Sequence, residues 1–374
     1  MTGGFRIGRI AGIEIAVHAS WLVIFFLVTY SLAVNQFPTQ FGGWPRALYW
    51  VVAGATSLLF FASVLAHELS HALVARRFKL KVSRITLFIF GGATNLEDEP
   101  QRARDEVLIA AAGPLSSLAI GGLMFAIDAS IAQPQVRALV GWLGFINISL
   151  GLFNLLPGFP MDGGRILRAI LWRMRGNRTA ATRNAAGVGR FFGYLLMAGG
   201  VYLALQPRGL FSGIWIALIG WFISTAAEGA VAQLTVESSL RGVTVRDVME
   251  TDPASVGPNE PVADLVNERM LRGEHRSFVV RHEDGGLAGV VTLSDVRRLP
   301  RESWEAARVT DIMTRYADLA TVTPETSAED AMRLLQAREV GQLPVVEADS
   351  RTVVGLLTRT GILRLIDTRT KLGV

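Results

Sequence analysis

The sequence VLAHELSHALV covers residues 64–74 and places His67, Glu68 and His71 inside an apolar stretch. On a helix, positions i and i+4 lie on one face, so the imidazoles of His67 and His71 can bind the same metal ion. Glu68 is then placed to take a proton from a water that the metal activates. Charged groups within a membrane segment are costly and usually functional. This favours a metal site over two interfacial histidines and a glutamate that reaches the membrane surface.

The composition of the 374-residue chain is that of a membrane protein. Half of its residues are hydrophobic and 18% are charged, whereas soluble domains carry about a quarter charged residues. The chain contains no cysteine, which excludes disulfides, thiolate catalysis and cysteine-based zinc sites. The net charge of +5 comes from basic residues beside apolar stretches. That pattern indicates membrane topology, so we expect no nucleic-acid partner.

Six apolar stretches precede residue 240, each close to the roughly 20 residues that cross a hydrocarbon core. They are Val17–Val34, Val51–Val74, Val107–Ile127, Ala138–Leu156, Val188–Leu205 and Leu210–Ala227. Arginine and lysine are concentrated before the first stretch, after the second, and between the fourth and fifth. By the positive-inside rule, we expect a multi-pass protein of the cell membrane with both termini in the cytoplasm.

A different pattern separates the second and third apolar stretches. Val82–Leu96 is rich in β-branched and aromatic residues and contains Gly91-Gly92, which predicts a short β-ribbon. Open strands cannot face lipid, so the ribbon must lie at the interface or line a protein cavity. We expect the charged segment Glu97–Glu106 that follows to be a solvated connector.

A catalytic zinc site needs a third protein ligand and an open position. The ends of the apolar stretches offer His18, Asp128, Asp162 and Glu228. Asp162 lies in NLLPGFPMDGGR (residues 154–165), where Pro157 and Pro160 break the helix at a depth that could match the two histidines. By itself Asp162 could equally be a helix N-cap, but the HELSH segment favours a ligand. His18 is more typical of an interfacial anchor.

These segments resemble the site-2 proteases, zinc metalloproteases that cut substrates inside the membrane. The resemblance rests on HELSH, on Ala112-Gly113-Pro114 and on residues 154–163, within a core of about residues 45–170. It implies that His67, His71 and Asp162 hold one zinc ion and that Glu68 activates water.

The same resemblance implies a role for Asn154, which could bind the substrate carbonyl or stabilise the oxyanion. The edge of the ribbon could hold an unwound substrate by strand addition. Asn147 lies on the same helical face as Asn154, and it either packs in the interior or faces substrate.

The part of the chain after residue 240 contains a repeat with a period of about 64–66 residues. Val245–Met249 aligns with Val309–Met313, and Leu287–Thr292 aligns with Val353–Thr358. The repeat resembles a pair of CBS (cystathionine-β-synthase) modules, which are α/β folds that commonly bind adenosine nucleotides between them.

The resemblance implies a nucleotide site at Thr292 and Asp295, where a carboxylate can hydrogen-bond ribose hydroxyls. In the second repeat Thr358 is followed by Gly361 in place of the aspartate. We therefore expect one intact site and one that is altered or empty. The alternative is a pair used only for dimerisation.

The predicted architecture is a six-span α-helical membrane protein with a short membrane-associated β-ribbon, followed by a cytoplasmic α/β CBS pair. The expected domains are residues 1–235, 240–302 and 305–370. We predict an intramembrane zinc endopeptidase that cleaves transmembrane segments of single-span proteins, such as a membrane-anchored regulator. Adenine nucleotide binding or homodimerisation through the CBS pair would regulate it.

The alternatives are a CBS-regulated transporter or channel and an inactive scaffold. A transporter would be expected to show repeated halves or several acidic residues along a path, and the chain has a single cluster. A scaffold is disfavoured because every residue that the chemistry needs is present.

Overall fold

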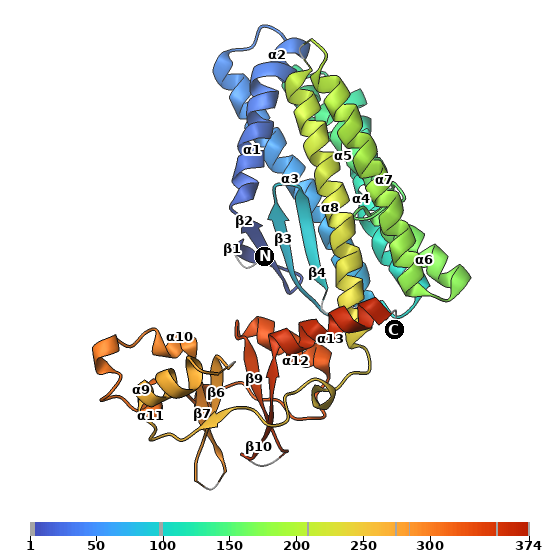
Figure 1. The fold of residues 1–374 in the computed structure, drawn as a ribbon. Helices are drawn as coiled ribbons and strands as arrows, with labels where there is room; N and C mark the ends of the chain where they lie inside the picture. Colours follow the sequence, from blue (N-terminus) through green and yellow to red (C-terminus); the bar gives the residue numbers. More distant parts are fainter. Residues whose placement is uncertain are drawn as a thin grey trace. The chain divides into compact units, whose positions relative to one another are not determined.

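The computed structural model describes residues 4–96, 100–207, 209–273, 275–283, 285–348 and 351–372. The chain forms two compact units, Met1–Ala232 and Gln233–Val374. The α-helices that begin in the described part of the first unit are α1 (Ser20–Ser31), α2 (Phe37–Gln40), α3 (Arg46–Arg77), α4 (Ala103–Ser130), α5 (Pro134–Asn154), α6 (Asp162–Arg175), α7 (Arg178–Ala204) and α8 (Leu210–Leu240) (Figure 1). A π-helix, Leu32–Gln36, joins α1 to α2.

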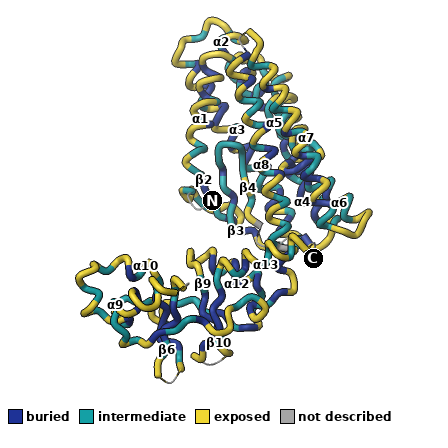
Figure 2. Tube along the Cα trace, viewed as in Figure 1, coloured by how far each residue is buried: buried dark blue, intermediate teal, exposed yellow. Residues whose placement is uncertain are grey.

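Within the described residues, six helical segments are long and apolar enough to cross a membrane. They are Ser20–Gln40, Arg46–Arg77, Ala103–Ser130, Pro134–Asn154, Arg178–Ala204 and Leu210–Leu240. The predicted spans are therefore confirmed, with different ends. The first begins at Ser20 rather than Val17, because Ile13–His18 forms a strand. Figure 2 shows exposed positions along the outer faces of the long helices, as expected of side chains that face lipid.

Four strands of the described part of this unit form one sheet in the order β1 (Gly4–Ile10), β2 (Ile13–His18), β3 (Val82–Phe88) and β4 (Gly91–Leu96). The predicted ribbon is confirmed as β3 and β4, which pair antiparallel. Strands β1 and β2 were not predicted, and β2 joins the ribbon by pairing parallel with β3. Ile13, Ile15 and Ile85 pack against Ala72 and Ala75 of α3, which fixes the sheet to the helix that carries HELSH.

Helix α4 packs against α3, α5 and α6. Small residues allow the close approach of α4 and α5, since a Cβ at Gly151 would lie 2.8 Å from Leu118 Cγ. Helix α5 ends at Asn154, and α6 begins at Asp162 after a short connection with a cis peptide bond between Phe159 and Pro160. This broken region brings the start of α6 to the side of α4.

The second unit is built from two similar α/β repeats. The first contains β5 (Ser255–Val256), α9 (Val262–Asp264), β6 (Ser277–Arg281), β7 (Leu287–Thr292) and α10 (Leu293–Val296). The second contains α11 (Val309–Ile312), β8 (Thr314–Arg315), α12 (Ala328–Ala337), β9 (Gln342–Val346), β10 (Val353–Thr358) and α13 (Arg359–Leu372).

The segment leading into each repeat pairs with the last strand of the other. Thr314 of β8 pairs with Val290 of β7, and Glu250 bridges to Leu356 of β10. Apolar residues of both repeats, among them Val279, Leu287 and Val346, share one buried cluster. The predicted α/β pair is thus confirmed, and its repeats interlock through reciprocal strand pairing.

Candidate metal centre

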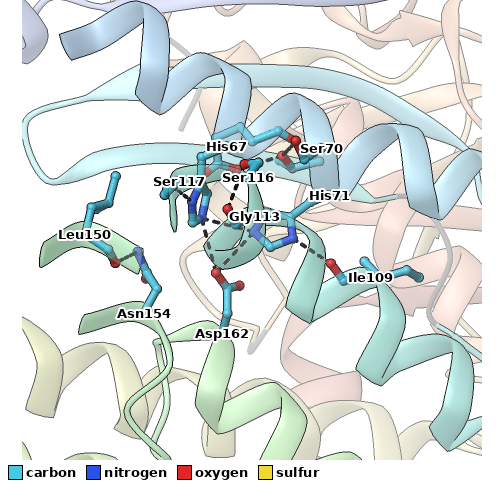
Figure 3. Close-up of polar contacts among 12 residues, drawn as sticks. His67, Ser70, His71, Ile109, Gly113, Ser116, Ser117, Leu150, Asn154 and Asp162 are labelled. Atoms are coloured by element: carbon cyan, nitrogen blue, oxygen red, sulfur yellow. Dashed lines mark hydrogen bonds and ion pairs between the residues drawn. The ribbon is translucent and has the colours of Figure 1, made fainter. Parts of the chain in front are cut away.

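Three side chains from two helices converge in the first unit. His67 and His71 come from α3, and Asp162 is the first residue of α6 (Figure 3). Asp162 Oδ2 lies 3.2 Å from His67 Nε2 and 3.1 Å from His71 Nε2, and the two Nε2 atoms are 3.2 Å apart. The exposed fractions of His67, His71 and Asp162 are 4%, 5% and 9%. The structure therefore brings together the three residues that the sequence predicted as ligands.

The separations of these atoms fit a zinc ion. Four ligands at zinc's bond length of about 2.0–2.1 Å occupy the corners of a tetrahedron whose edges are about 3.3 Å. The three observed separations, 3.1–3.2 Å, are close to that edge. Two imidazole nitrogens and one carboxylate oxygen are also a donor set that zinc accepts, and they leave the fourth corner for water or substrate.

Helix α4 orients both imidazole rings through contacts to their Nδ1 atoms. His71 Nδ1 lies 2.7 Å from the carbonyl oxygen of Ile109, and His67 Nδ1 lies 3.0 Å from Ser117 Oγ. A carbonyl only accepts, so His71 carries its proton on Nδ1 and directs the lone pair of Nε2 into the cluster. Gly113 lies between these two partners. A Cβ at this position would overlap Nε2 of both histidines.

The proposed base lies on the side of α3 that faces the sheet. Glu68 Oε2 accepts a hydrogen bond of 2.7 Å from Thr94 Oγ1 on β4. Neither Thr94 nor Ser117 was singled out from sequence, because a single hydroxyl residue on a strand or helix carries no distinctive pattern. Gly113 was noted only as part of a resembling motif.

A buried ion pair corrects one prediction. Glu106 was expected in a solvated connector, but it lies in the first turn of α4 and is fully buried. Its carboxylate accepts a hydrogen bond from Arg168 Nε of α6 at 2.6 Å. For Glu106 the prediction was wrong, because the charge pattern of the connector does not reveal a partner 62 residues away. Residues 97–99 of that segment lie outside the described residues.

Other sequence candidates lie outside the cluster of three. Asn154 Nδ2 donates to the carbonyl of Leu150 at 3.0 Å, within its own helix (Figure 3). Asn147 is fully buried and donates in the same way to Leu143 at 2.9 Å. His18 Nδ1 lies 2.8 Å from Ser20 Oγ, and Asp128 pairs with Arg137 at 3.4 Å.

In the second unit, Thr292 and Asp295 contact each other. Asp295 Oδ2 accepts hydrogen bonds from the Thr292 backbone at 2.9 Å and from its hydroxyl at 2.7 Å. The first of these bonds is half of a capping box at the start of α10, whose other half is the Thr292 side chain accepting from the backbone N–H of Asp295. In the second repeat the Thr358 hydroxyl accepts from the backbone N–H of Gly361 at 3.0 Å. The two positions therefore differ in chemistry, since only the first carries a carboxylate.

Comparison with known proteins finds a matching family for each of the two units. A family model for peptidase family M50 matches residues 55–131 and 121–198, and one for the CBS domain matches residues 245–302 and 309–368. The chain is 36% identical to the zinc metalloprotease designated Rip3 of Mycobacterium tuberculosis, over 98% of this chain and 94% of that protein. It is 34% identical to the zinc metalloprotease designated sll0528 of Synechocystis sp., over 98% and 97%.

Among solved structures, the site-2 protease from Methanocaldococcus jannaschii is 28% identical and covers 61% of this chain and 95% of its own, with a TM-score of 0.43. The match to peptidase family M50, together with a donor cluster buried among helices long and apolar enough to cross a membrane, defines the class as membrane-embedded metalloprotease. The chain belongs to peptidase family M50, the site-2 protease family of zinc metalloproteases, and it carries a tandem pair of CBS domains.

Proposed function

We propose that this protein is an intramembrane zinc endopeptidase that cleaves the transmembrane segments of single-span membrane proteins. In this proposal His67, His71 and Asp162 hold one zinc ion, and Glu68 is the catalytic base. The observation that supports it best is the cluster of three buried ligand atoms at tetrahedral separations. The cluster lies between helices long and apolar enough to cross the membrane. A substrate that reaches it would be cut within the bilayer.

Zinc, when bound, supplies a Lewis acid that polarises the scissile carbonyl and makes water acidic enough to attack near neutral pH. Glu68 takes the proton of the attacking water and returns it to the leaving amine. Asn154 could donate its amide to the substrate carbonyl or to the oxyanion by exchanging its present bond to Leu150.

A helical substrate hides its carbonyls in its own hydrogen bonds, so it must unwind before attack. Strand β4 lies at one edge of the described sheet and close to Glu68. The backbone groups of that edge could pair with an unwound substrate as an added strand.

The direct test is cleavage of a single-span test substrate by the purified protein in liposomes. We expect wild-type protein to cleave it, and both Glu68→Gln and a zinc chelator to abolish cleavage. Glutamine keeps the size of the side chain but cannot take a proton. Full cleavage by Glu68→Gln would contradict the assignment of the base.

We also propose that both termini and the CBS pair lie in the cytoplasm, from the positive-inside distribution of arginine and lysine. The absence of native cysteine makes a labelling test clean. In intact cells, a membrane-impermeant maleimide should label Ser130→Cys, at the exposed C-terminal end of the third span. It should label Ala306→Cys only after lysis. The reverse pattern would invert the topology.

For the CBS pair we propose control of the protease, either by an adenine nucleotide at Thr292 and Asp295 or by homodimerisation. The carboxylate of Asp295 supports the first possibility, because it could exchange its bonds to Thr292 for ribose hydroxyls. The reconstituted protein is titrated with adenine nucleotides while its cleavage rate and its oligomeric state are measured. This experiment separates control by a nucleotide from control by homodimerisation.

A further inference from the structure

The second strand of the ribbon contacts the proposed base directly. Thr94 Oγ1 donates to Glu68 Oε2 at 2.7 Å and lies 3.4 Å from the backbone carbonyl oxygen of Glu68. A hydroxyl has one proton to donate, and the shorter contact, to a carboxylate, is the stronger bond. Strand β4 thus fixes the carboxylate of Glu68 from outside its own helix.

Gly92 confines the rest of the same side chain. It lies two residues before Thr94 and therefore on the same face of β4. A Cβ at Gly92 would overlap Glu68 Cγ and lie 2.9 Å from Cδ. The aliphatic part of Glu68 therefore fills the space that glycine leaves, while Thr94 holds its end.

The support behind Thr94 is rigid. Thr94 pairs across the ribbon with Ile85 of β3, and Ile85 is fully buried against Ala72 and Ala75 of α3. Interiors packed in this way tolerate little displacement. The hydroxyl is consequently held at a defined position relative to the helix that carries His67, Glu68 and His71.

We propose that Thr94 is a positioning residue that holds the Glu68 carboxylate in the orientation from which it takes the proton of the attacking water. This inference rests on the proposed function, in which Glu68 is the base. A glutamate side chain has several rotatable bonds and loses considerable freedom when it is held in one conformer. Because a misplacement of about 1 Å can cost about a hundredfold in rate, a fixed carboxylate raises kcat rather than substrate affinity.

The test compares Thr94→Val, Thr94→Ser and wild type in liposomes with the single-span test substrate. Valine keeps the branched shape without the hydroxyl, and serine keeps the hydroxyl. We expect Thr94→Val to lower kcat by about ten- to a hundredfold, with KM and zinc content unchanged, and Thr94→Ser to retain most of the wild-type rate.

Thr86→Val is the matched control, because Thr86 lies on β3 next to Ile85 and so projects from the opposite face of the sheet. It should keep the wild-type kcat. If Thr94→Val destabilises the sheet, Thr94→Ala removes the same hydroxyl without β-branching and replaces it in the comparison.

A double-mutant cycle shows whether Thr94 acts through Glu68. Glu68→Asp shortens the side chain and withdraws the carboxylate from Thr94, so Thr94→Val should then change kcat by less than about twofold. An equal loss in both backgrounds would overturn the inference, as would a wild-type kcat for Thr94→Val or an effect confined to KM. An active Glu68→Gln protein would instead refute the proposed function. An inactive Glu68→Gln beside a fully active Thr94→Val would refute only the role of Thr94.

Discussion

Arg168 and Glu106 form a buried ion pair that joins the helix of Asp162 to the helix that orients both histidines. Arg168 Nε donates to Glu106 Oε1 at 2.6 Å, and a second guanidinium nitrogen contacts the same oxygen. Glu106 lies one helical turn before Ile109, the backbone partner of His71. The guanidinium also lies 5.2 Å from the centre of the Phe159 ring. This pair braces α4 against α6 beside the proposed metal ligands.

Replacing Glu106 by glutamine removes the charge that a buried guanidinium faces. Breaking a buried ion pair on one side costs about 3–5 kcal/mol, because the remaining charge has lost the compensation for its desolvation. We expect a loss of that size for Glu106→Gln in denaturant unfolding of the protein in detergent micelles. Arg173→Ala, an exposed change on α6, the helix that carries Arg168, should stay within about 0.5 kcal/mol of wild type.

The double replacement Glu106→Leu with Arg168→Met completes this experiment. Removing both charges can be nearly neutral, since the desolvation cost disappears together with the attraction. We expect the double variant to be more stable than Glu106→Gln. Equal stability of Glu106→Gln and Arg173→Ala would show that the pair does not brace the two helices.

The sequence predicted the spans and the ribbon because their signals are local. A run of about 20 apolar residues predicts a membrane span wherever it packs, and β-branched residues around Gly91-Gly92 predict a strand pair. The cluster of His67, His71 and Asp162 was also suggested from sequence, since helical spacing pairs the histidines and two prolines break the chain before the aspartate.

The rest depends on contacts between distant segments. Burial of Glu106 follows from Arg168, and the contact of Thr94 with Glu68 follows from the way the ribbon lies on α3. Strands β1 and β2 lie immediately before the first apolar span. The predicted span began at Val17 and therefore included the last residues of β2. Such features arise from tertiary packing, which composition and periodicity do not specify.

Gly113→Ala should disrupt the metal centre. The added Cβ would overlap Nε2 of His67 and of His71, so the rings could not converge with Asp162. We expect the zinc affinity of the purified protein, measured by chelator competition, to fall by at least about tenfold. Gly122→Ala on the same helix is the control, because a Cβ there meets nothing within 4 Å. Alanine favours a helix over glycine, so a loss at Gly113 would not reflect helix propensity. Equal zinc affinity in the two variants would contradict this reading of the site.

Ser117→Ala removes the group that contacts His67 Nδ1 at 3.0 Å. Loss of such an orienting partner typically weakens metal binding about 10- to 100-fold. We expect a weakening in that range, with unchanged zinc stoichiometry at saturating metal. Ser116→Ala is the matched control, since the Ser116 hydroxyl donates to the backbone carbonyl of Gly113 at 2.7 Å within its own helix. If both variants bind zinc equally well, Ser117 does not orient His67.

The two CBS repeats differ where the first carries Asp295 and the second carries Gly361, each three residues after its threonine. A Cβ at Gly361 would lie 3.2 Å from Thr358 Oγ1 and 3.5 Å from the Val248 carbonyl, so an aspartate there requires only a small adjustment. We expect calorimetry with AMP to give one site per chain for wild type and two for Gly361→Asp.

The variant Asp295→Asn should bind AMP about ten- to a hundredfold more weakly at the first site, because a hydrogen bond to a charged group contributes about 1.5–3 kcal/mol. Wild-type protein that binds no AMP and also forms a dimer in sedimentation would contradict nucleotide binding. It would favour dimerisation as the role of the pair.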